Sequence, residues 1–414
     1  MKKKGLAVLV ILLFIGICAI PSTGSVIKET YTQVSSGDTL YVGGSGPGNY
    51  SSIQSAVDDD VDGDTVFIYS GVYHEHDIRV EKSISIVGED SETTIIDGDD
   101  ISQYHILILF DDNSFVKSLT FRNIRSSGLM VWCCDGNQIL DCRGIDILEE
   151  GVCIVDSDNN YVSNYVMLDN GIGIYITGNL GPGISSGNVI ENCSFPDTGF
   201  IWLYEATDNV INNCFFDGGG IRVQSPGCVN NTYMNCQFYN TTGIEFNQEG
   251  GNEKIINCYF NDASTYGIDI ESSHPGLEIR DCTFIGSWAS SIIFWSPAVD
   301  VVVSGCKFVN NGYEGLVFFS TLRYVDVSYC HFENNKFGIN MYVSNFWNSF
   351  HHNNFIDNEA NIHTRGTGSA VRFMINSWEQ NYWDDYNGIL PWYHIFGFLN
   401  WDFNPASEPN DIEV

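Results

Sequence analysis

The chain has 414 residues, and its 52 acidic residues against 18 basic ones give a net charge of −34 at pH 7. A chain this acidic makes a poor partner for nucleic acid, because phosphate binding requires a basic face. Glycine is frequent at 41 residues, proline is scarce at 10, and aromatic residues make up 14% of the chain. This composition favours β structure with many turns.

The N-terminal segment has the layout of an export signal. Lys2–Lys4 precede the apolar run Leu6–Ile20, which ends at Pro21–Gly24. The run is short for a membrane span. We therefore predict that residues 1–24 are a cleaved signal peptide, with an uncleaved N-terminal membrane anchor as the alternative. Both interpretations place the rest of the chain outside the cytoplasm, either secreted or at the cell surface.

A cysteine returns at nearly constant spacing along most of the chain. The slot holds Cys142, Cys193, Cys214, Cys236, Cys258, Cys282, Cys306 and Cys330, and from Cys193 onward the steps are 21, 22, 22, 24, 24 and 24 residues. Two short alternating strands per unit, with a period in the low twenties, are typical of a coil that stacks on itself. We predict an all-β, right-handed parallel β-helix of about 10–12 rungs over residues 71–370.

The same spacing predicts what fills the coil. Residues two apart on a strand share a face, so the cysteine and phenylalanine of each C-x-F point inward together. Buried thiols then act as small apolar fillers, although disulfides or a bound soft metal are alternatives. Beyond the predicted signal, four cysteines fall outside the slot and are the better disulfide candidates: Cys133, Cys134, Cys153 and Cys228.

Both ends of such a coil need lids, because terminal rungs expose strand edges and an open core. Residues 25–70 contain a short amphipathic stretch in which Ile53, Ala56 and Val57 share a helical face, and we expect it to cover the N-terminal end. Residues 371–414 are dense in tryptophan and tyrosine. We predict an aromatic C-terminal cap there, with sugar binding by the tryptophans as the alternative.

Several motifs resemble those of known β-helix proteins. The "SSIQSAV", "GDTV", "GVYHE" and "SISIVGE" elements of residues 51–89 occur in this order. They resemble the opening of pectin-lyase-like proteins, and more closely that of NosD-type and archaeal surface β-helix proteins. "NYWDDY" (381–386) is similar to the ends of the latter. The resemblance implies a scaffold rather than a reaction, although the NosD family is described as copper-binding and linked to maturation of a copper enzyme.

The outward positions of the second strand of each unit are where function is expected. If Ile221 and Val223 face inward, the alternation exposes Arg222 and, on the following turns, Glu245, Asp269 and Glu271. Neighbouring carboxylates of this kind supply the acid and base of glycoside hydrolases. We therefore predict a catalytic cluster and, around it, a substrate-binding set: Trp295, Phe319, Tyr342, Gln224 and Asn247. The alternative is a chance cluster in an acidic chain, partly covered by the C-terminal tail, a loop or a partner.

Two short stretches suggest metal binding. Asp58, Asp60 and Asp62 have the D-x-D-x-D-G spacing of calcium loops, although a polar turn after a helix has the same residues. His74 and His76 lie on one side of an extended segment and are candidate ligands, for copper only if the NosD resemblance extends to function.

Taken together, the sequence predicts an exported or surface β-helix protein that binds polysaccharide or glycoconjugate along its flank. A carbohydrate-active enzyme, hydrolase before lyase, and a NosD-like factor in copper binding or metalloenzyme maturation are the alternatives. The oligomeric state is not predicted.

Overall fold

The computed structural model describes residues 37–168, 171–178, 183–197, 199–342, 346–364, 375–395 and 400–412. The predicted signal or anchor, residues 1–24, lies outside them. From residue 37 the described chain forms a right-handed parallel β-helix, which confirms the predicted fold class. Among the described residues, no helix has both the length and the apolar character needed to cross a membrane.

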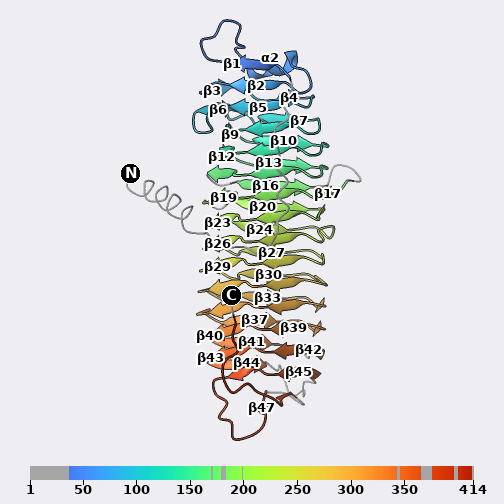
Figure 1. Cartoon of the computed structure of the whole chain (residues 1–414), viewed down its shortest axis with the longest axis vertical. Helices are drawn as coiled ribbons and strands as arrows, with labels where there is room; N and C mark the ends of the chain where they lie inside the picture. Colours follow the sequence, from blue (N-terminus) through green and yellow to red (C-terminus); the bar gives the residue numbers. More distant parts are fainter. Residues whose placement is uncertain are drawn as a thin grey trace, which may run out of the picture. The chain divides into compact units, whose positions relative to one another are not determined.

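Three sheets of mainly parallel strands run along the coil, and most turns add one strand to each of them (Figure 1). A representative turn consists of β25 (Thr232–Met234) in sheet A, β26 (Gln237–Tyr239) in sheet B and β27 (Ile244–Phe246) in sheet C. Sheet B has 14 strands and sheet C has 13. The coil is thus longer than the expected 10–12 rungs, because its first turns, from β1 (Thr39–Val42), precede the cysteine slot.

Sheet C carries the predicted functional residues. Its strands, in spatial order, are β4 (Ile78–Val80), β7 (Leu107–Leu109), β10 (Leu129–Trp132), β13 (Glu150–Val155), β16 (Ile172–Thr177), β20 (Phe200–Tyr204), β24 (Gly220–Val223), β27, β30 (Ile268–Ile270), β33 (Ile292–Phe294), β37 (Glu314–Phe318), β41 (Phe337–Met341) and β44 (Ala360–Thr364).

The interior is built as the C-x-F spacing predicts. Cys236 lies at the corner between β25 and β26 and is fully buried, as are its counterparts on the neighbouring turns. The phenylalanines two residues further on stack face to face: ring centroids lie 4.7 Å apart for Phe238 and Phe260 and 4.6 Å apart for Phe260 and Phe284. Each turn therefore places the same side chain over the previous one, and this fixes the register of the coil.

All twelve cysteines in the described part of the chain are free thiols. The four disulfide candidates are therefore unpaired here: Cys134, Cys153 and Cys228 are buried, and Cys133 is exposed. In the ladder, the Cys236 thiol donates to the Met234 carbonyl at 3.3 Å. Burial raises the pKa of Cys142 to about 12, so this thiol is protonated at neutral pH and packs as a small apolar side chain.

A second ladder, of buried asparagines, precedes the strands of sheet A. The side-chain amide Nδ2 of each asparagine donates to Oδ1 of the asparagine on the next turn, at 3.0–3.1 Å. The ladder runs through Asn137, Asn160, Asn188, Asn209 and Asn231. The next rung places Glu253 in the slot, where Oε1 accepts from Asn231 at 3.1 Å. Glu253 is fully buried, and burial raises the pKa of its carboxyl group to about 8. The sequence contains this repeat, which our sequence analysis did not identify.

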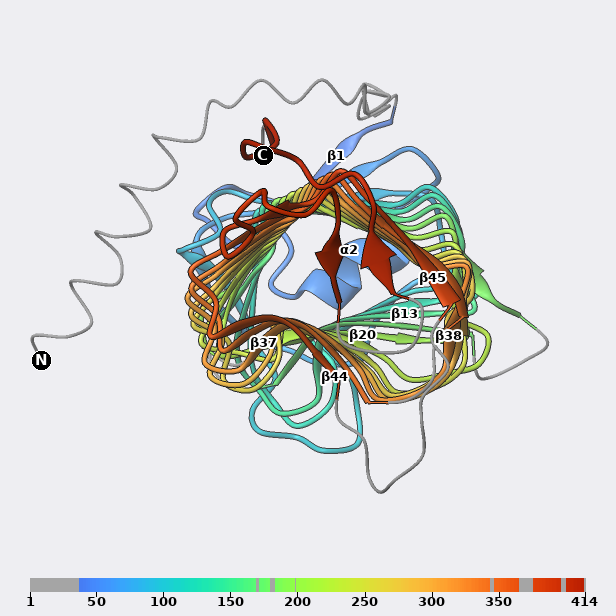
Figure 2. The ribbon, with the colours of Figure 1, turned by 90° about the horizontal axis from the view of Figure 1, so that it is seen from below.

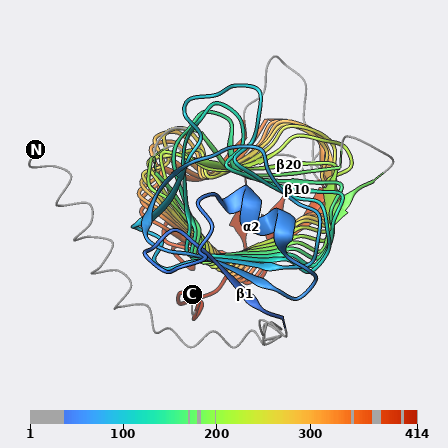
Figure 3. The same cartoon turned by 90° about the horizontal axis from the view of Figure 1, so that it is seen from above.

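The helix α2 (Ile53–Asp59) lies across the N-terminal opening of the coil (Figure 3). Ile53, Ala56 and Val57 are buried, as the helical face predicts. The Glu75 carboxylate accepts the Ile53 amide at 2.7 Å, which satisfies an otherwise unpaired donor at the start of the helix. Parallel pairing begins before the expected boundary at residue 71, because β1 pairs with β2 (Thr65–Ile68).

The aromatic C-terminal segment closes the other end (Figure 2). Trp383 is buried between Phe355 and Tyr393, with ring centroids 4.5 and 4.4 Å away. The buried Asp402 carboxylate accepts the Trp383 indole N–H at 3.2 Å. Trp383 therefore extends the internal ladder, and its faces are not available to a sugar.

Beyond the cap, the tail folds back along the coil. The Asn410 amide donates to the Asn354 side chain of β43 (Asn354–Ile356) at 2.7 Å. The described part of the tail therefore lies on sheet B, and it does not cover the outward residues of sheet C.

Candidate functional site

Three of the predicted catalytic residues lie on consecutive strands of sheet C, and the fourth, Glu271, directly follows the third of these strands. Arg222, Glu245 and Asp269 are direct neighbours in the register of β24, β27 and β30, and Glu271 follows two residues after Asp269. Their strands alternate as expected, because the flanking Ile221 and Val223 are fully buried. The outer face of the sheet therefore brings one cation and three carboxylates together.

The carboxylates differ in their surroundings. The pKa of Asp269 is raised to about 6, mainly by burial. The charges of Glu271 and Glu245 also raise it, whereas the hydrogen bond that the Trp295 indole N–H donates to Oδ1 at 2.9 Å lowers it. Burial also raises the pKa of Glu245, whereas the Arg222 guanidinium, whose Nε lies 3.2 Å from Oε2, lowers it. At neutral pH a fraction of Asp269 thus remains protonated.

Arg222 is held on both sides. Its guanidinium carbon lies 3.9 Å from the Phe200 ring centroid, while Nε pairs with Glu245. A cation between a ring face and a carboxylate is stabilised in its charged form. Arg222 therefore positions Glu245 and is not free to act as a base.

The predicted stacking platforms have a different geometry from the one expected. Trp295, Phe319 and Tyr342 stack on one another, with ring centroids 4.6 and 4.0 Å apart and planes within 16°. Because neighbouring turns are about 5 Å apart, successive rings occupy each other's faces. The three form a wall beside the carboxylates that offers ring edges, rather than faces, to a ligand.

Alternation along the strands places the middle column of the outer face outward, but several of its side chains are covered. Ile293, Val317 and Asn340 are 2%, 1% and 0% exposed, and Met130 on an earlier turn is 6% exposed. One reason is that the Tyr266 ring reaches Trp295 from the other end of the strand, with centroids 6.2 Å apart. Large side chains at both strand ends thus close over the small apolar ones between them.

The site contains residues that the sequence analysis missed. Tyr266 and Glu314 occupy the position directly before the glycine of the second strand, two turns apart. The Glu314 carboxylate accepts the Asn340 amide at 2.8 Å and is itself buried. The same position holds Thr242 and Ser290 on neighbouring turns. Aligning the repeats would therefore have shown that a tyrosine and a glutamate are unusual there.

Gln224 and Asn247 continue the outer column next to Glu271. Both side chains are half-buried, and Asn247 Oδ1 is shielded from solvent without a hydrogen-bond partner in the described structure. Depressions of about 720 Å³ and about 440 Å³ lie elsewhere, the first around Asp100 and Arg125 and the second beside the tail at Asn410. Glu271 and Trp295 are exposed, so the candidate site lies on the outer flank of the coil.

The three aspartates of the predicted calcium loop all have partners within the chain. The Lys82 ammonium lies 2.9 Å from Asp60 Oδ1 and donates to the Asp60 carbonyl at 2.6 Å. Asp58 accepts from the Gln54 amide at 2.7 Å, and Asp62 accepts the Ser83 amide at 3.2 Å. The Lys82 ammonium thus already neutralises Asp60, and this pairing disfavours calcium at the turn after α2.

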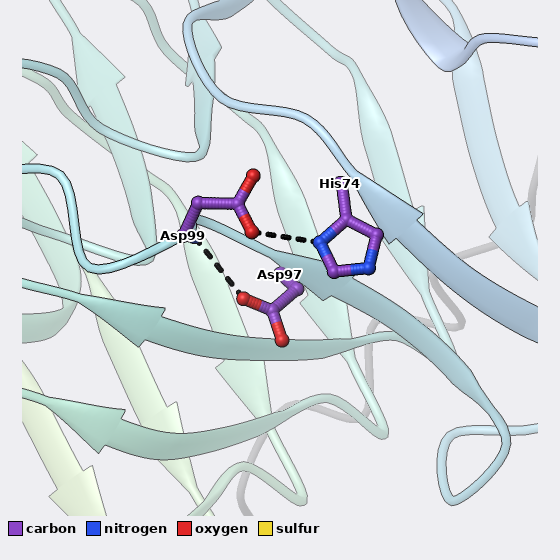
Figure 4. Close-up of side chains that lie close together, drawn as sticks. All are labelled: His74, Asp97 and Asp99. Carbon is purple, nitrogen blue, oxygen red and sulfur yellow. Dashed lines mark hydrogen bonds and ion pairs between the residues drawn. The ribbon is translucent and has the colours of Figure 1, made fainter.

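The two candidate histidines are engaged separately. The His76 ring stacks on Tyr104 with centroids 5.3 Å apart, whereas His74 Nδ1 lies 2.7 Å from Asp99 Oδ1. His74, Asp97 and Asp99 could together offer three ligand atoms (Figure 4). Asp97, however, already accepts Nε of Arg122 at 2.9 Å. A cation there would displace or face this guanidinium, so the arrangement does not favour a metal.

The comparisons with known proteins agree with the fold. The family model of the right handed beta helix region matches residues 73–216, 137–284 and 248–377. No curated protein matches the chain in sequence.

Three solved structures illustrate the similarity. A PL6 alginate lyase, in complex with a trisaccharide, superposes with a TM-score of 0.53 at 12% identity over 86% of this chain and 88% of the lyase chain. The catalytic domain of a GH87 alpha-1,3-glucanase, in complex with nigerose, gives a TM-score of 0.49 at 14% identity, over 84% of this chain and 69% of the glucanase chain. PfbA, a surface adhesin of Streptococcus pneumoniae, gives a TM-score of 0.43 at 12% identity, over 79% of this chain and 86% of the adhesin chain. At such identities the similarity concerns the coil and not the site.

Proposed function

Because the chain belongs to the right-handed β-helix family, we propose that it binds an extended, uncharged polysaccharide along the outer face of sheet C. The observation that carries the proposal is the row of partly exposed polar and aromatic side chains on consecutive turns: Gln224, Asn247, Glu271, Trp295, Phe319 and Tyr342. Amides and carboxylates accept and donate to hydroxyl groups, and aromatic edges contact the C–H groups of sugar rings.

The shape and charge of this face support the ligand class. An open flank suits a long polymer better than a small molecule, which needs a concave pocket. The net charge of −34 and the three carboxylates repel acidic polymers. We therefore expect a neutral polysaccharide as the ligand.

Affinity electrophoresis tests the proposal. The purified protein is run in native gels that contain hydroxyethylcellulose, dextran or polygalacturonate. We expect a neutral polymer to retard the protein, and Glu271→Gln together with Trp295→Ala to reduce the retardation. Equal mobility of the wild type in all gels would contradict polysaccharide binding.

A glycoside hydrolase is the second candidate, and the raised pKa of Asp269, about 6, favours it. Hydrolysis needs one protonated carboxyl group as acid and one ionised carboxylate as base or nucleophile. Asp269 fits the acid, and Glu271 or Glu245 fits the partner. A lyase is less well supported, because Arg222 is paired. A reducing-end assay decides: Asp269→Asn should abolish any activity found, and retention of full activity would exclude this site.

Two narrower assignments remain proposals. Location outside the cytoplasm, with or without an N-terminal anchor, rests on the composition of residues 1–24; sequencing the N-terminus of the exported protein tests it. The NosD-type assignment, with a role in copper binding or metalloenzyme maturation, rests on the motifs of residues 51–89. Metal analysis of protein purified without chelators tests it, and an absence of copper would count against it.

A further inference from the structure

On most turns, the strand of sheet A is bounded by two corners at which the backbone is left-handed. On six consecutive turns, every corner residue has a φ between 52° and 75°. The first corner holds, in order, Asn230, Asn252, Gly276, Asp300, Tyr324 and Trp347; the second holds Asn235, Asn257, Asp281, Gly305, Tyr329 and His352. The last two turns therefore replace small or polar residues by rings at both corners.

This replacement is unfavourable for the backbone. Asparagine, aspartate and glycine tolerate the left-handed region, whereas a bulky side chain there is an outlier with a conformational cost. The other four turns hold asparagine, aspartate or glycine at both corners, so the coil does not require rings there. Strain of this kind tends to occur at functional sites, where another interaction maintains it.

Burial does not compensate for the strain. Tyr324, Trp347 and Tyr329 are 54%, 55% and 44% exposed. The rings pair across turns instead: Tyr324 and Trp347 stack with centroids 5.8 Å apart, and Tyr329 and His352 with centroids 4.8 Å apart. The result is two exposed aromatic pairs, one at each corner of the sheet.

Polar groups lie between the two pairs. Asp326 and His351 project from β39 (Asp326–Ser328) and β42 (Phe346–His351), and His351 Nε2 lies 3.2 Å from Asp326 Oδ2. The guanidinium carbon of Arg323 lies 5.7 Å from the Trp347 centroid. Five residues of extended chain separate Tyr324 from Tyr329, a span of about 16 Å. Hydrogen-bonding groups thus occupy the centre of a strip with aromatic side chains at both ends.

We infer that this aromatic corner patch, made of Tyr324, Trp347, Tyr329 and His352 around Asp326 and His351, is a second contact surface for a neutral polysaccharide. The exposed ring edges of the two stacked pairs contact the C–H groups of pyranose rings, and the central side chains hydrogen-bond to hydroxyl groups. The acidity of the chain disfavours a polyanion. The inference rests on the proposed function for the class of ligand, but it concerns sheet A and a separate set of residues.

The test uses the residue that the coil itself places at these corners. Tyr324→Asn with Trp347→Asn removes both rings at the first corner and does not change the charge, so mobility without polymer is unaffected. In native gels with hydroxyethylcellulose or dextran, we expect the double variant to bind about tenfold more weakly than the wild type, as the loss of two aromatic contacts implies. Its melting temperature should stay equal or rise, because the strain is relieved. Trp288→Asn, at an exposed ring outside the patch (71% exposed), is the control and should bind normally.

The outcomes separate this inference from the proposal on sheet C. If the corner variant binds normally while Glu271→Gln with Trp295→Ala loses binding, the patch is not a contact surface and the proposed function holds. The reverse result supports the patch and contradicts the sheet C surface. A lower melting temperature of the corner variant would show that the rings support the fold, and absence of wild-type binding would overturn both statements.

Discussion

The substitution Glu253→Gln should remove a large pH dependence of stability. Glu253 occupies the asparagine slot of the buried ladder, and its pKa in the fold is about 8 against an ordinary value of 4.5. The fold therefore favours the protonated form. Its stabilising contribution is complete below pH 4.5 and is lost as the pH rises through about 8.

The magnitude follows from the same values. One pKa unit corresponds to about 1.4 kcal/mol, so raising the pH from about 4.5 to 7 should cost the wild type about 3 kcal/mol at this site. Glutamine has the same shape and no charge, so it retains the hydrogen bond from Asn231 and does not titrate. The variant should match the wild type at pH 4.5 and be more stable at pH 7 and above.

Guanidinium denaturation at pH 4.5, 7 and 8 measures this difference, since all other titrating groups are common to both proteins. Glu249→Gln, an exposed glutamate of the same turn, is the matched control and should follow the wild type. Parallel pH profiles for the wild type and Glu253→Gln would refute the argument that the buried carboxyl group is held protonated.

Other consequences of the structure can be measured directly. Phe260→Ala interrupts the internal ring ladder and should cost about 3–5 kcal/mol in denaturant unfolding, and a cost below about 1 kcal/mol would contradict the packing. In the native protein, iodoacetamide should modify the exposed Cys133 before the buried Cys258, as peptide mass spectrometry would show; equal rates would place Cys258 at the surface. Millimolar Ca²⁺ should leave the melting temperature unchanged, because Lys82 fills the acidic turn, whereas a clear increase would indicate a calcium site. Binding of a neutral polysaccharide should change between pH 5 and 7 as Asp269 loses its proton, and Asp269→Asn should abolish that change.

Repetition explains why so much of the fold can be predicted from the chain alone. A spacing in the low twenties forces equivalent residues to lie over one another, and alternation then assigns each residue to the inside or the outside. The burial of Cys236 and Phe238 and the neighbouring positions of Glu245 and Asp269 follow from these two rules. The asparagine ladder obeys them as well and could have been found in the same way.

Side-chain direction and long-range contacts do not follow from those rules. The stacking of Trp295 on Phe319 depends on rotamers, the pairing of Lys82 with Asp60 joins residues 22 apart, and the return of the tail to Asn354 depends on the cap. Only the tertiary structure decides these points, because the energies that determine them arise between side chains that the repeat brings close but does not orient. The sequence by itself determined the coil and its inward columns; the three-dimensional arrangement decided which outward side chains remain available to a ligand.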